Sequence, residues 1–462
     1  MSRLAVRPAA ARLLAATCAA TLAGAAACAD APSAPSAPTA TPALDRGGAA
    51  GAAGAAGAAG ATGAAGGAEG RGDFHRYVAV GTSVSMGWQS DGVLAESQET
   101  SWPAQLARLA HRELSLPRIA FPGCGAPLAA PLASGLRISR EPVAAPLAER
   151  VCAPNDTNVA LPAGNVAIVG ARTDQALLAT PEAPDPNYAP VYSRVLAPGQ
   201  SQITAMEALD PKIVSVELGA NEILGVRDGA YVPGQTVVPV GAWAPVYRAV
   251  VDRVDRAARR AVLVGLVDDA RSFPSFRTGA ELWAARTTFA PFYVQVSDDC
   301  AGSENLLFVP VRVPLAAAQG AARARAGLSP AVLSCANAPA AAPDGSVIRD
   351  YVLSPAEVAQ ANAQLAAMNA VIRAEAERRR FAYFALGALY ERANQKAPFS
   401  AVTLLTSPQP YGPLISLDGL HPSAAGHAVL AAAAAQALNA RYRLGIPTSA
   451  LAPARSAAVA EY

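Results

Sequence analysis

The sequence lacks the motifs on which several common functional classes depend. It contains no P-loop, no dinucleotide-binding glycine fingerprint and no His-Glu-x-x-His motif, which argues against nucleotide binding and zinc-peptidase chemistry. None of its six cysteines stands in a Cys-x-x-Cys spacing, so neither a zinc site nor a redox motif is supported. We therefore expect no metal and no cofactor.

Charge of either sign is also scarce, because only 16% of the residues are charged and the formal net charge is +2. Three of the arginines, Arg3, Arg7 and Arg12, lie in a segment that we expect to be removed. The mature chain is then close to neutral and carries no electrostatic footprint for a polyanion. We expect no nucleic-acid partner.

The N-terminal part has the pattern of an export signal followed by a tether. Residues 1–27 carry the three arginines, then an apolar run that is too short to span a bilayer, and then small residues before Cys28. The stretch 25–28 resembles a degenerate bacterial lipobox without its usual leucine, so lipid anchoring at Cys28 and plain secretion both stay open. Residues 28–72 are a low-complexity Ala/Gly/Pro segment and predict a flexible linker.

Four cysteines follow this region, an even number in a compartment that we expect to be extracytoplasmic and oxidising. Four cysteines allow three pairings. We favour the local ones, Cys124 with Cys152 and Cys300 with Cys335, because each pair brackets a loop rich in Pro, Ala and Gly. Buried free thiols are the alternative.

Apolar strands alternate with helical stretches along the rest of the chain, which predicts an α/β fold: a three-layer sandwich with a central parallel sheet flanked by helices. The expected strands lie at about 77–81, 165–169, 213–218, 261–267 and 381–386, and the expected helices at 101–114, 200–209, 244–260, 354–380 and 422–443. The long loop 117–162 is a candidate lid or pocket wall. Residues 269–352, with an expected strand at 306–313, are read as an insertion into a domain of residues 73–445, and 446–462 as a C-terminal tail.

Two stretches near the ends of this domain carry candidate catalytic groups. Ser83 follows an apolar run that ends at a glycine, where a strand of an open α/β sheet passes into a loop. Far along the chain, Asp418 stands three residues before His421, close enough to hold one ring nitrogen while the other takes a proton from a serine. Either stretch alone is a weak signal, since turns often contain Gly and Ser.

Two further strand ends offer N–H groups. Residues 165–171 and 213–222 each form an apolar run, and these runs end at Gly170 and at Gly219-Ala220-Asn221. A backbone N–H and a side-chain amide in such places can bind a developing oxyanion.

In the order Ser, Gly, Asn and Asp-x-x-His, these four stretches resemble the four blocks of the SGNH hydrolase superfamily, also called GDSL-like lipases and esterases. The resemblance spans about residues 74–440 and implies a flavodoxin-like sheet. It implies that Ser83 is the nucleophile, that Asp418 and His421 complete the triad, and that Gly170 and Asn221 join the Ser83 backbone N–H in the oxyanion hole.

Two positions depart from the family pattern, Thr82 in place of the usual Asp and Glu222 where an Asp often follows the Asn. The α/β-hydrolase elbow is disfavoured, because Ser85 occupies the last glycine position of Gly-x-Ser-x-Gly. His427 is expected to pack or cap, and the tryptophans Trp88 and Trp102 to lie in the core.

The sequence thus predicts an extracytoplasmic serine esterase that hydrolyses acyl or acetyl esters of lipids or carbohydrates. Its expected partner is a small-molecule, lipid or glycan ester, with membrane attachment through the N-terminus left open and a monomer expected. The alternative is a catalytically weakened protein of the same fold that binds ligands or interacts with the cell envelope, for which Thr82 and Glu222 are the only sequence support.

Overall fold

The computed structural model describes residues 72–144, 149–342, 344–393 and 396–448. The expected signal peptide, nearly all of the expected linker with Cys28, and most of the expected tail lie outside the described residues.

The main sheet has four parallel strands in the order β1-β2-β3-β9. Their bounds are Tyr77–Gly81 for β1, Ile213–Glu217 for β2, Arg260–Gly265 for β3 and Ala382–Ala385 for β9. The segment 165–168 runs parallel along the free edge of β1, where Val166 N donates to Ala79 O at 2.9 Å and Ile168 N to Gly81 O at 3.1 Å. Because this edge segment comes second in the chain, the order is the flavodoxin-like one, 2-1-3-4-5, and the predicted fold class is confirmed.

The strands form where the chain has short runs of β-branched and other apolar residues. Every residue of β1 and β2 is buried, and in β3 only Arg260 is partly exposed. A parallel sheet covered on both faces requires such continuous apolar runs, since neither side of a strand meets water.

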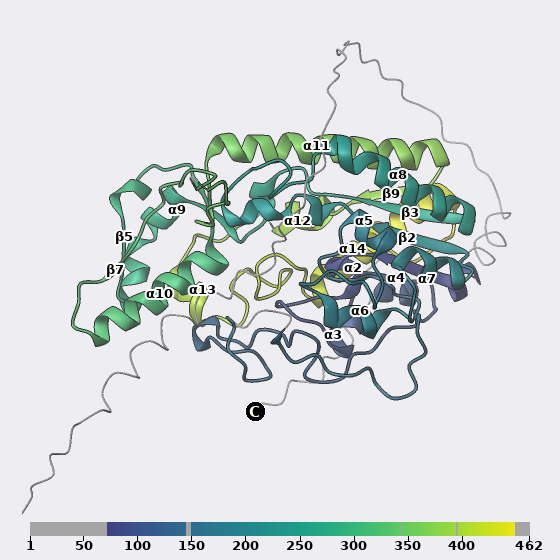
Figure 1. Ribbon diagram of the computed structural model, residues 1–462, viewed down its shortest axis with the longest axis horizontal. Helices are drawn as coiled ribbons and strands as arrows, with labels where there is room; N and C mark the ends of the chain where they lie inside the picture. The colour runs from purple at the N-terminus through teal and green to yellow at the C-terminus, as the bar shows by residue number, and fades with distance from the viewer. Residues whose placement is uncertain (1–71, 145–148, 343, 394–395, 449–462) are drawn as a thin grey trace, which may run out of the picture.

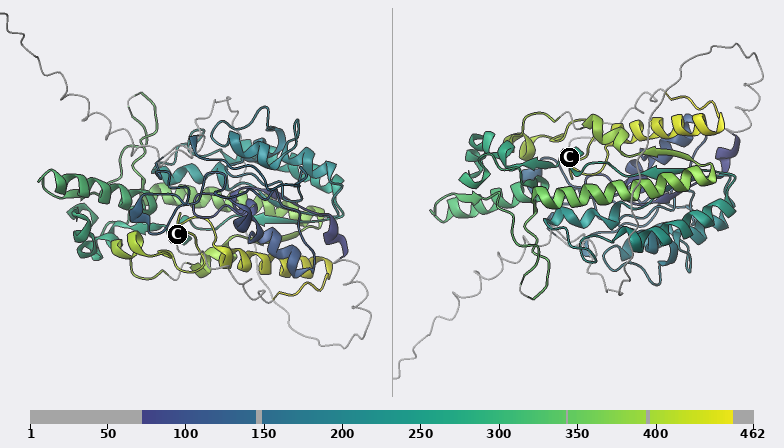
Figure 2. Two further views of the ribbon diagram at one scale, coloured as in Figure 1. Left: turned by 90° about the horizontal axis from the view of Figure 1, so that it is seen from below. Right: turned by 90° about the horizontal axis from the view of Figure 1, so that it is seen from above.

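Helices cover both faces of the sheet (Figures 1 and 2). One layer packs on β3 and β9 and consists of α4 (Trp102–Leu109), α12 (Gly387–Ala393) and α14 (Ala424–Tyr442). The other layer consists of α5 (Thr173–Leu178), α7 (Gln202–Ala208), α8 (Val240–Ala257) and α11 (Pro355–Arg379). Shorter helices lie in the connections: α2 (Ser83–Met86), α3 (Ala95–Glu99) and α6 (Ala189–Val195).

Two of the expected helices show how the chain sets helix ends. Ser354 and Glu357 form a capping box at the start of α11, with the Ser354 hydroxyl accepting from Glu357 N and the Glu357 carboxylate accepting from Ser354 N. The helix expected to reach residue 114 ends at Leu109, because His111 adopts a left-handed φ of 58° and Arg112 N returns to Ala107 O. At the start of this helix Ser101 occupies the N-cap position, but its side chain makes no capping hydrogen bond.

A group of small elements lies beside the main sheet, at the left of Figure 1. It contains an antiparallel sheet of β4 (Phe276–Thr278), β6 (Leu306–Phe308) and β8 (Val352–Leu353), and a parallel pair of β5 (Val294–Val296) and β7 (Ala331–Leu333). Its helices are α9 (Gly279–Ala284), α10 (Val309–Arg325) and α13 (Ala401–Thr406). The strand expected at 306–313 stops at Phe308, because α10 begins at Val309 and Pro310 lies in its first turn, where the fixed φ of proline is tolerated.

Both predicted disulfides are present, Cys124–Cys152 and Cys300–Cys335. They close loops with sequence separations of 28 and 35 residues, and loop-closure entropy gives each a stabilisation of about 3.7 kcal/mol. Disulfides are typical of proteins outside the reducing cytoplasm. Within the part of the chain that the structure describes, no helix combines the length and the apolar character needed to cross a bilayer.

Candidate active site

The three segments predicted to surround the reaction centre leave the sheet at the same edge. Gly81 at the end of β1 is in register with Glu217 at the end of β2, and Ile168 N donates to Gly81 O on the other side. Ser83, Gly170 and Asn221 follow these three strand ends by two to four residues. The parallel sheet therefore brings them together at its carboxyl edge, where open α/β sheets bind ligands.

Ser83 is the first residue of α2, and the turn before it requires a glycine. A Cβ on Gly81 would lie 2.6 Å from Ser85 Oγ and 2.8 Å from Ser85 Cβ, so no larger residue fits without moving the helix. The Gly81 N–H is held by Gln202 Oε1 at 3.0 Å. This sharp turn sets Ser83 at the N-terminus of a helix, where its own N–H has no partner within the helix.

Ser83, His421 and Asp418 form one continuous chain of hydrogen bonds. Ser83 Oγ lies 2.8 Å from His421 Nε2, and His421 Nδ1 lies 2.9 Å from Asp418 Oδ2. Ser83 is 6% exposed, and the side chains of His421 and Asp418 are 14% and 10% exposed. Ser83 and His421 are 338 positions apart in the sequence, and the fold brings their side chains into contact.

The carboxylate of Asp418 is surrounded by donors. Oδ1 accepts from the backbone N–H groups of Leu420 and His421, each at 2.9 Å, and from Ser416 Oγ at 3.2 Å, while Oδ2 also accepts from Asp91 N at 2.8 Å. Burial by itself would raise the pKa of Asp418, but the charge and hydrogen bonds of His421 and the backbone donors lower the pKa to about 2. Asp418 therefore stays ionised and accepts a hydrogen bond from the Nδ1–H of His421.

Gly170 has a left-handed φ of 74°, and a Cβ there would lie 1.9 Å from the ring of Tyr188, so the ring and the backbone both require glycine. Asn221 lies in a 3-10 turn of residues Ala220–Glu222, and its Nδ2 donates to Ala171 O at 2.9 Å. A side-chain amide has two N–H groups, so one remains available for a ligand. The segments that carry Gly170 and Asn221 are thus bonded to each other.

Glu217 is a site residue that the sequence reasoning missed. It is 1% exposed, and its carboxylate accepts from Thr82 N at 3.0 Å, from Thr82 Oγ1 at 2.8 Å and from Ser85 N at 3.2 Å. Burial raises its pKa, although these bonds oppose the increase. Glu217 therefore holds the turn on both sides of Ser83, and the Thr82 hydroxyl has a defined role as its donor. A lone carboxylate closing an apolar strand was the signal in the sequence.

Glu222 also has a defined structural role. Its side chain is buried, and Oε1 accepts from Thr173 N, the first residue of α5, at 2.6 Å. Trp243 Nε1 donates to the hydroxyl of the same Thr173 at 2.8 Å. Burial is the main cause that raises the pKa of Glu222 to about 7. Glu222 thus ties the segment after Gly170 to the segment that carries Asn221.

The buried Glu222 predicts a pH dependence of stability. Its pKa rises from 4.5 unfolded to about 7 folded, so the folded state binds the proton more tightly and loses stability as pH rises through this window. Relative to Glu222→Gln, which keeps an acceptor for Thr173, the wild type should lose about 3 kcal/mol between about pH 4 and about pH 8. Urea unfolding of both proteins at the two pH values measures this difference. The exposed Glu113→Gln is the control, and a parallel pH dependence in wild type and Glu222→Gln would rule out the effect.

Three other residues that the sequence brought into question, Ser85, His427 and Trp88, lie in the core. Ser85 is fully buried, and its Oγ accepts from Trp102 Nε1 at 3.2 Å, so it belongs to the core beneath the turn. His427 is 0% exposed, accepts from Trp102 N through Nδ1 at 3.3 Å, and has a pKa lowered to about 3, chiefly by burial. Its expected packing role fits this position. Trp88 is also buried in the core.

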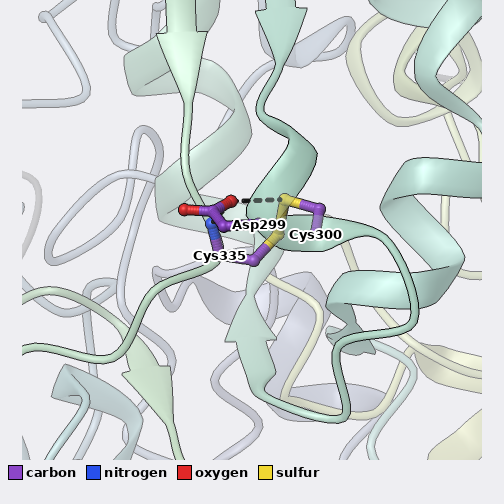
Figure 3. Close-up of side chains that lie close together, drawn as sticks. All are labelled: Asp299, Cys300 and Cys335. Atoms are coloured by element: carbon purple, nitrogen blue, oxygen red, sulfur yellow. Dashed lines mark hydrogen bonds between the residues drawn. A yellow bond between two sulfur atoms is a disulfide. The ribbon is translucent and has the colours of Figure 1, made fainter.

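One cluster of candidate metal ligands occurs among the described residues: Asp299 beside the second disulfide (Figure 3). Asp299 Oδ1 accepts from Cys335 N at 3.0 Å and lies 3.4 Å from Cys300 Sγ. The two sulfur atoms are bonded to each other and offer no thiolate, which is the form of cysteine that binds metal. The carboxylate therefore caps a backbone N–H beside the disulfide.

Serine hydrolases activate a hydroxyl through a serine that is hydrogen-bonded to a histidine, which is in turn hydrogen-bonded to an aspartate. The same arrangement lies here at the carboxyl edge of the parallel sheet. A family model described as GDSL-like Lipase/Acylhydrolase matches residues 77–434, most of the chain, and the protein belongs to this family of ester hydrolases.

Other comparisons add little. A search of the curated proteins gave no match. One similar solved structure is the crystal structure of LAE5, an alpha/beta hydrolase enzyme from the metagenome of Lake Arreo, Spain, at 12% identity and a TM-score of 0.33, covering 80% of this chain and 94% of that chain. A similarity of this size says nothing about the chemistry of either protein.

Proposed function

We propose that this protein is an extracytoplasmic serine esterase that cleaves acyl or acetyl esters of lipids or carbohydrates through Ser83, His421 and Asp418. The observation that carries the proposal is the unbroken series from Ser83 Oγ to His421 Nε2 at 2.8 Å and from His421 Nδ1 to Asp418 Oδ2 at 2.9 Å. With Nδ1 donating to the carboxylate, Nε2 is left as an acceptor for the serine proton.

In the proposed reaction, Ser83 Oγ attacks the ester carbonyl while His421 takes the hydroxyl proton. The carbonyl oxygen becomes an oxyanion, and Asp418 stabilises the charged imidazole. When the intermediate collapses, the bond to the alcohol breaks and His421 gives its proton to the leaving oxygen. Water then repeats the sequence on the acyl-enzyme, which releases the acid and restores the serine.

The oxyanion is assigned to the N–H groups of Ser83 and Gly170 and to the free N–H of Asn221. These groups are uncharged donors on backbone segments that Glu217 and Glu222 hold in place. Fixed donors stabilise the oxyanion at little cost because they need not reorganise as charge develops.

Asn221→Ala should lower kcat by about 10²- to 10³-fold at nearly constant KM, since the bond to the oxyanion tightens only as charge develops. Asn221→Asp should be worse, because a carboxylate would repel the oxyanion. Steady-state kinetics and melting temperature of both variants measure this. If Asn221 only shapes the turn through Ala171 O, both variants would lose stability and keep their turnover per folded molecule.

The alternative of a catalytically weakened binding protein rests on Thr82 and Glu222. Both residues have hydrogen-bond partners that support the reaction centre, Glu217 for Thr82 and Thr173 for Glu222. These contacts favour the enzyme. The wild-type protein should react quickly and covalently with a fluorophosphonate probe, and peptide mapping should place the adduct on Ser83, because only an activated serine reacts at such a rate. An inert Ser83 would favour the binding protein.

The compartment and the substrate are further parts of the proposal. Two disulfides support residence outside the cytoplasm, and residues 1–27 are assigned to a signal peptide, with Cys28 as the candidate for lipid attachment. Mass analysis of the exported protein would reveal a diacylglyceryl group on Cys28 or its absence. A panel of esters that differ in acyl length, tested with lipid and sugar alcohols, would separate lipid esterase from carbohydrate deacetylase.

A further inference from the structure

A tight turn at residues 89–92, close to the site, has two consecutive non-glycine residues with a left-handed backbone. Gln89 N donates to Gly92 O at 2.8 Å, and Gly92 N donates back to Gln89 O at 3.1 Å. The two central residues, Ser90 and Asp91, have φ values of 52° and 58°. A hairpin turn of this kind favours glycine, asparagine or aspartate in these places, so Asp91 tolerates the conformation while Ser90 is held against its own backbone preference.

This turn is hydrogen-bonded to the loop that carries Asp418, the acid of the proposed triad. Asp91 N donates to Asp418 Oδ2 at 2.8 Å, on the same oxygen that faces His421. Ser90 N donates to Ser416 Oγ at 2.9 Å, and Leu417 N donates to Ser90 Oγ at 3.2 Å. Asp418 Oδ2 thus has a donor from outside its own loop, and its position depends on where the turn lies.

Two guanidinium groups hold this turn in place. The carboxylate of Asp91 accepts from Arg137 Nη2 at 2.5 Å and from Arg150 Nη1 at 2.9 Å, and Arg137 Nη1 also donates to the Asp91 carbonyl at 2.9 Å. The side chains of Arg137 and Arg150 are 0% and 3% exposed. Two buried positive charges are costly unless paired, and Asp91 supplies a carboxylate to both.

Both arginines come from the loop that the Cys124–Cys152 disulfide closes. Cys124 itself pairs with Val93, next to the turn, through Val93 N to Cys124 O and Cys124 N to Val93 O. A connected series of contacts therefore runs from the disulfide-closed loop, through the buried arginines and the turn, to Asp418.

We propose that Asp91 is a positioning residue for the triad: its ion pairs with Arg137 and Arg150 fix the left-handed turn so that the Asp91 N–H holds Asp418 against His421. The inference rests on the proposed function, because it gives Asp91 its effect through the imidazole that activates Ser83. Without the ion pairs, the turn relaxes toward its preferred backbone, Asp418 loses a donor, and the ring is no longer aligned with the serine. Small misplacements of a catalytic group are costly to rate.

The test is Asp91→Asn, which keeps the N–H, the size and the tolerance for left-handed φ but removes the charge. We expect kcat to fall about 10- to 100-fold with KM nearly unchanged, and fluorophosphonate labelling of Ser83 to slow by a similar factor. Asp156→Asn is the matched control. It breaks an ion pair with Arg118, at 2.9 Å, in the longer segment 117–162 that contains the disulfide-closed loop, and no hydrogen bond joins Asp156 to Asp418 among the described contacts. The control should keep the wild-type kcat.

Because Asp91→Asn removes the carboxylate charge that faces two buried arginines, Ser416→Ala is the second variant. It removes the acceptor of Ser90 N and a donor to Asp418 Oδ1 without unpairing a charge, and should lower kcat several-fold at constant KM. The inference fails if folded Asp91→Asn, or Ser416→Ala where Asp91→Asn does not fold, turns over and labels like the wild type. A wild-type protein that does not label at Ser83 overturns the proposed function itself, which is a different result from equal labelling of wild type and variants.

Discussion

Ser83→Ala is expected to lower kcat by about 10⁴- to 10⁶-fold while the protein stays folded and KM stays close to the wild-type value. The hydroxyl that is removed is the group bonded to His421 Nε2, so the variant has no nucleophile for the imidazole to activate. Fixed oxyanion donors would remain, and they account for the residual rate that we expect above the uncatalysed reaction. Kinetics on an activated ester, combined with thermal unfolding, measure both parts of this prediction.

Ser85→Ala is the matched control, because it is a serine two residues away on the same short helix. Its hydroxyl accepts from Trp102 Nε1 in the core, so the variant should lose stability and keep its turnover per folded molecule. Wild-type activity in Ser83→Ala, or a loss confined to Ser85→Ala, would remove Ser83 from the mechanism.

The sheet was predictable from the sequence because its strands are buried on both faces. The runs at 77–80 and 261–264 are continuously apolar, a pattern that is typical of short strands inside a sheet covered on both faces. The ends of elements were less predictable. The helix after Ser101 ends at Leu109, because His111 has a left-handed φ, and the strand that begins at Leu306 ends at Phe308, because a helix begins at Val309. Both outcomes depend on local geometry that an apolar pattern does not encode.

The candidate site was also predictable from the sequence only in part. The residues with distinctive side-chain chemistry, Ser83, Asn221 and the Asp-x-x-His pair, could be proposed from spacing and resemblance. The groups that hold them could not, because their contacts join distant parts of the chain. Asp91 acts on Asp418 through a backbone N–H, which leaves no signature in the sequence. Arginines such as Arg137 usually lie on surfaces, and only the fold shows this one to be buried.

The buried supports also explain why the two departures from the family pattern are compatible with an intact site. Thr82 lies where the usual Asp would place a second carboxylate beside Glu217, and its hydroxyl instead donates to that carboxylate. Like charges in one buried place repel, so a donor beside Glu217 is the more stable arrangement. Glu222 reaches Thr173 N on the neighbouring segment.

The second large effect is expected for Asp418→Asn, which should lower kcat by about 10⁴-fold through the wrong imidazole tautomer. An asparagine has one acceptor oxygen, whereas both oxygens of Asp418 accept from fixed donors. Oδ1 faces the backbone N–H groups of Leu420 and His421, so the asparagine oxygen belongs there and its NH₂ must take the place of Oδ2. An NH₂ beside Nδ1 forces that nitrogen to accept, which puts the ring proton on Nε2, against Ser83.

Kinetics combined with unfolding separate this loss from simple damage to the fold. With a pKa of about 2, Asp418 stays ionised at every working pH, so the wild type always has a carboxylate to accept from the Nδ1–H of His421. The loss in Asp418→Asn should therefore lie in kcat with KM nearly unchanged, and fluorophosphonate labelling of Ser83 should slow by a similar factor. A variant that merely loosened the loop would lower the melting temperature and keep its turnover per folded molecule. Steady-state kinetics, labelling and thermal unfolding of both proteins decide the matter, and a kcat within about tenfold of the wild type would take Asp418 out of the triad.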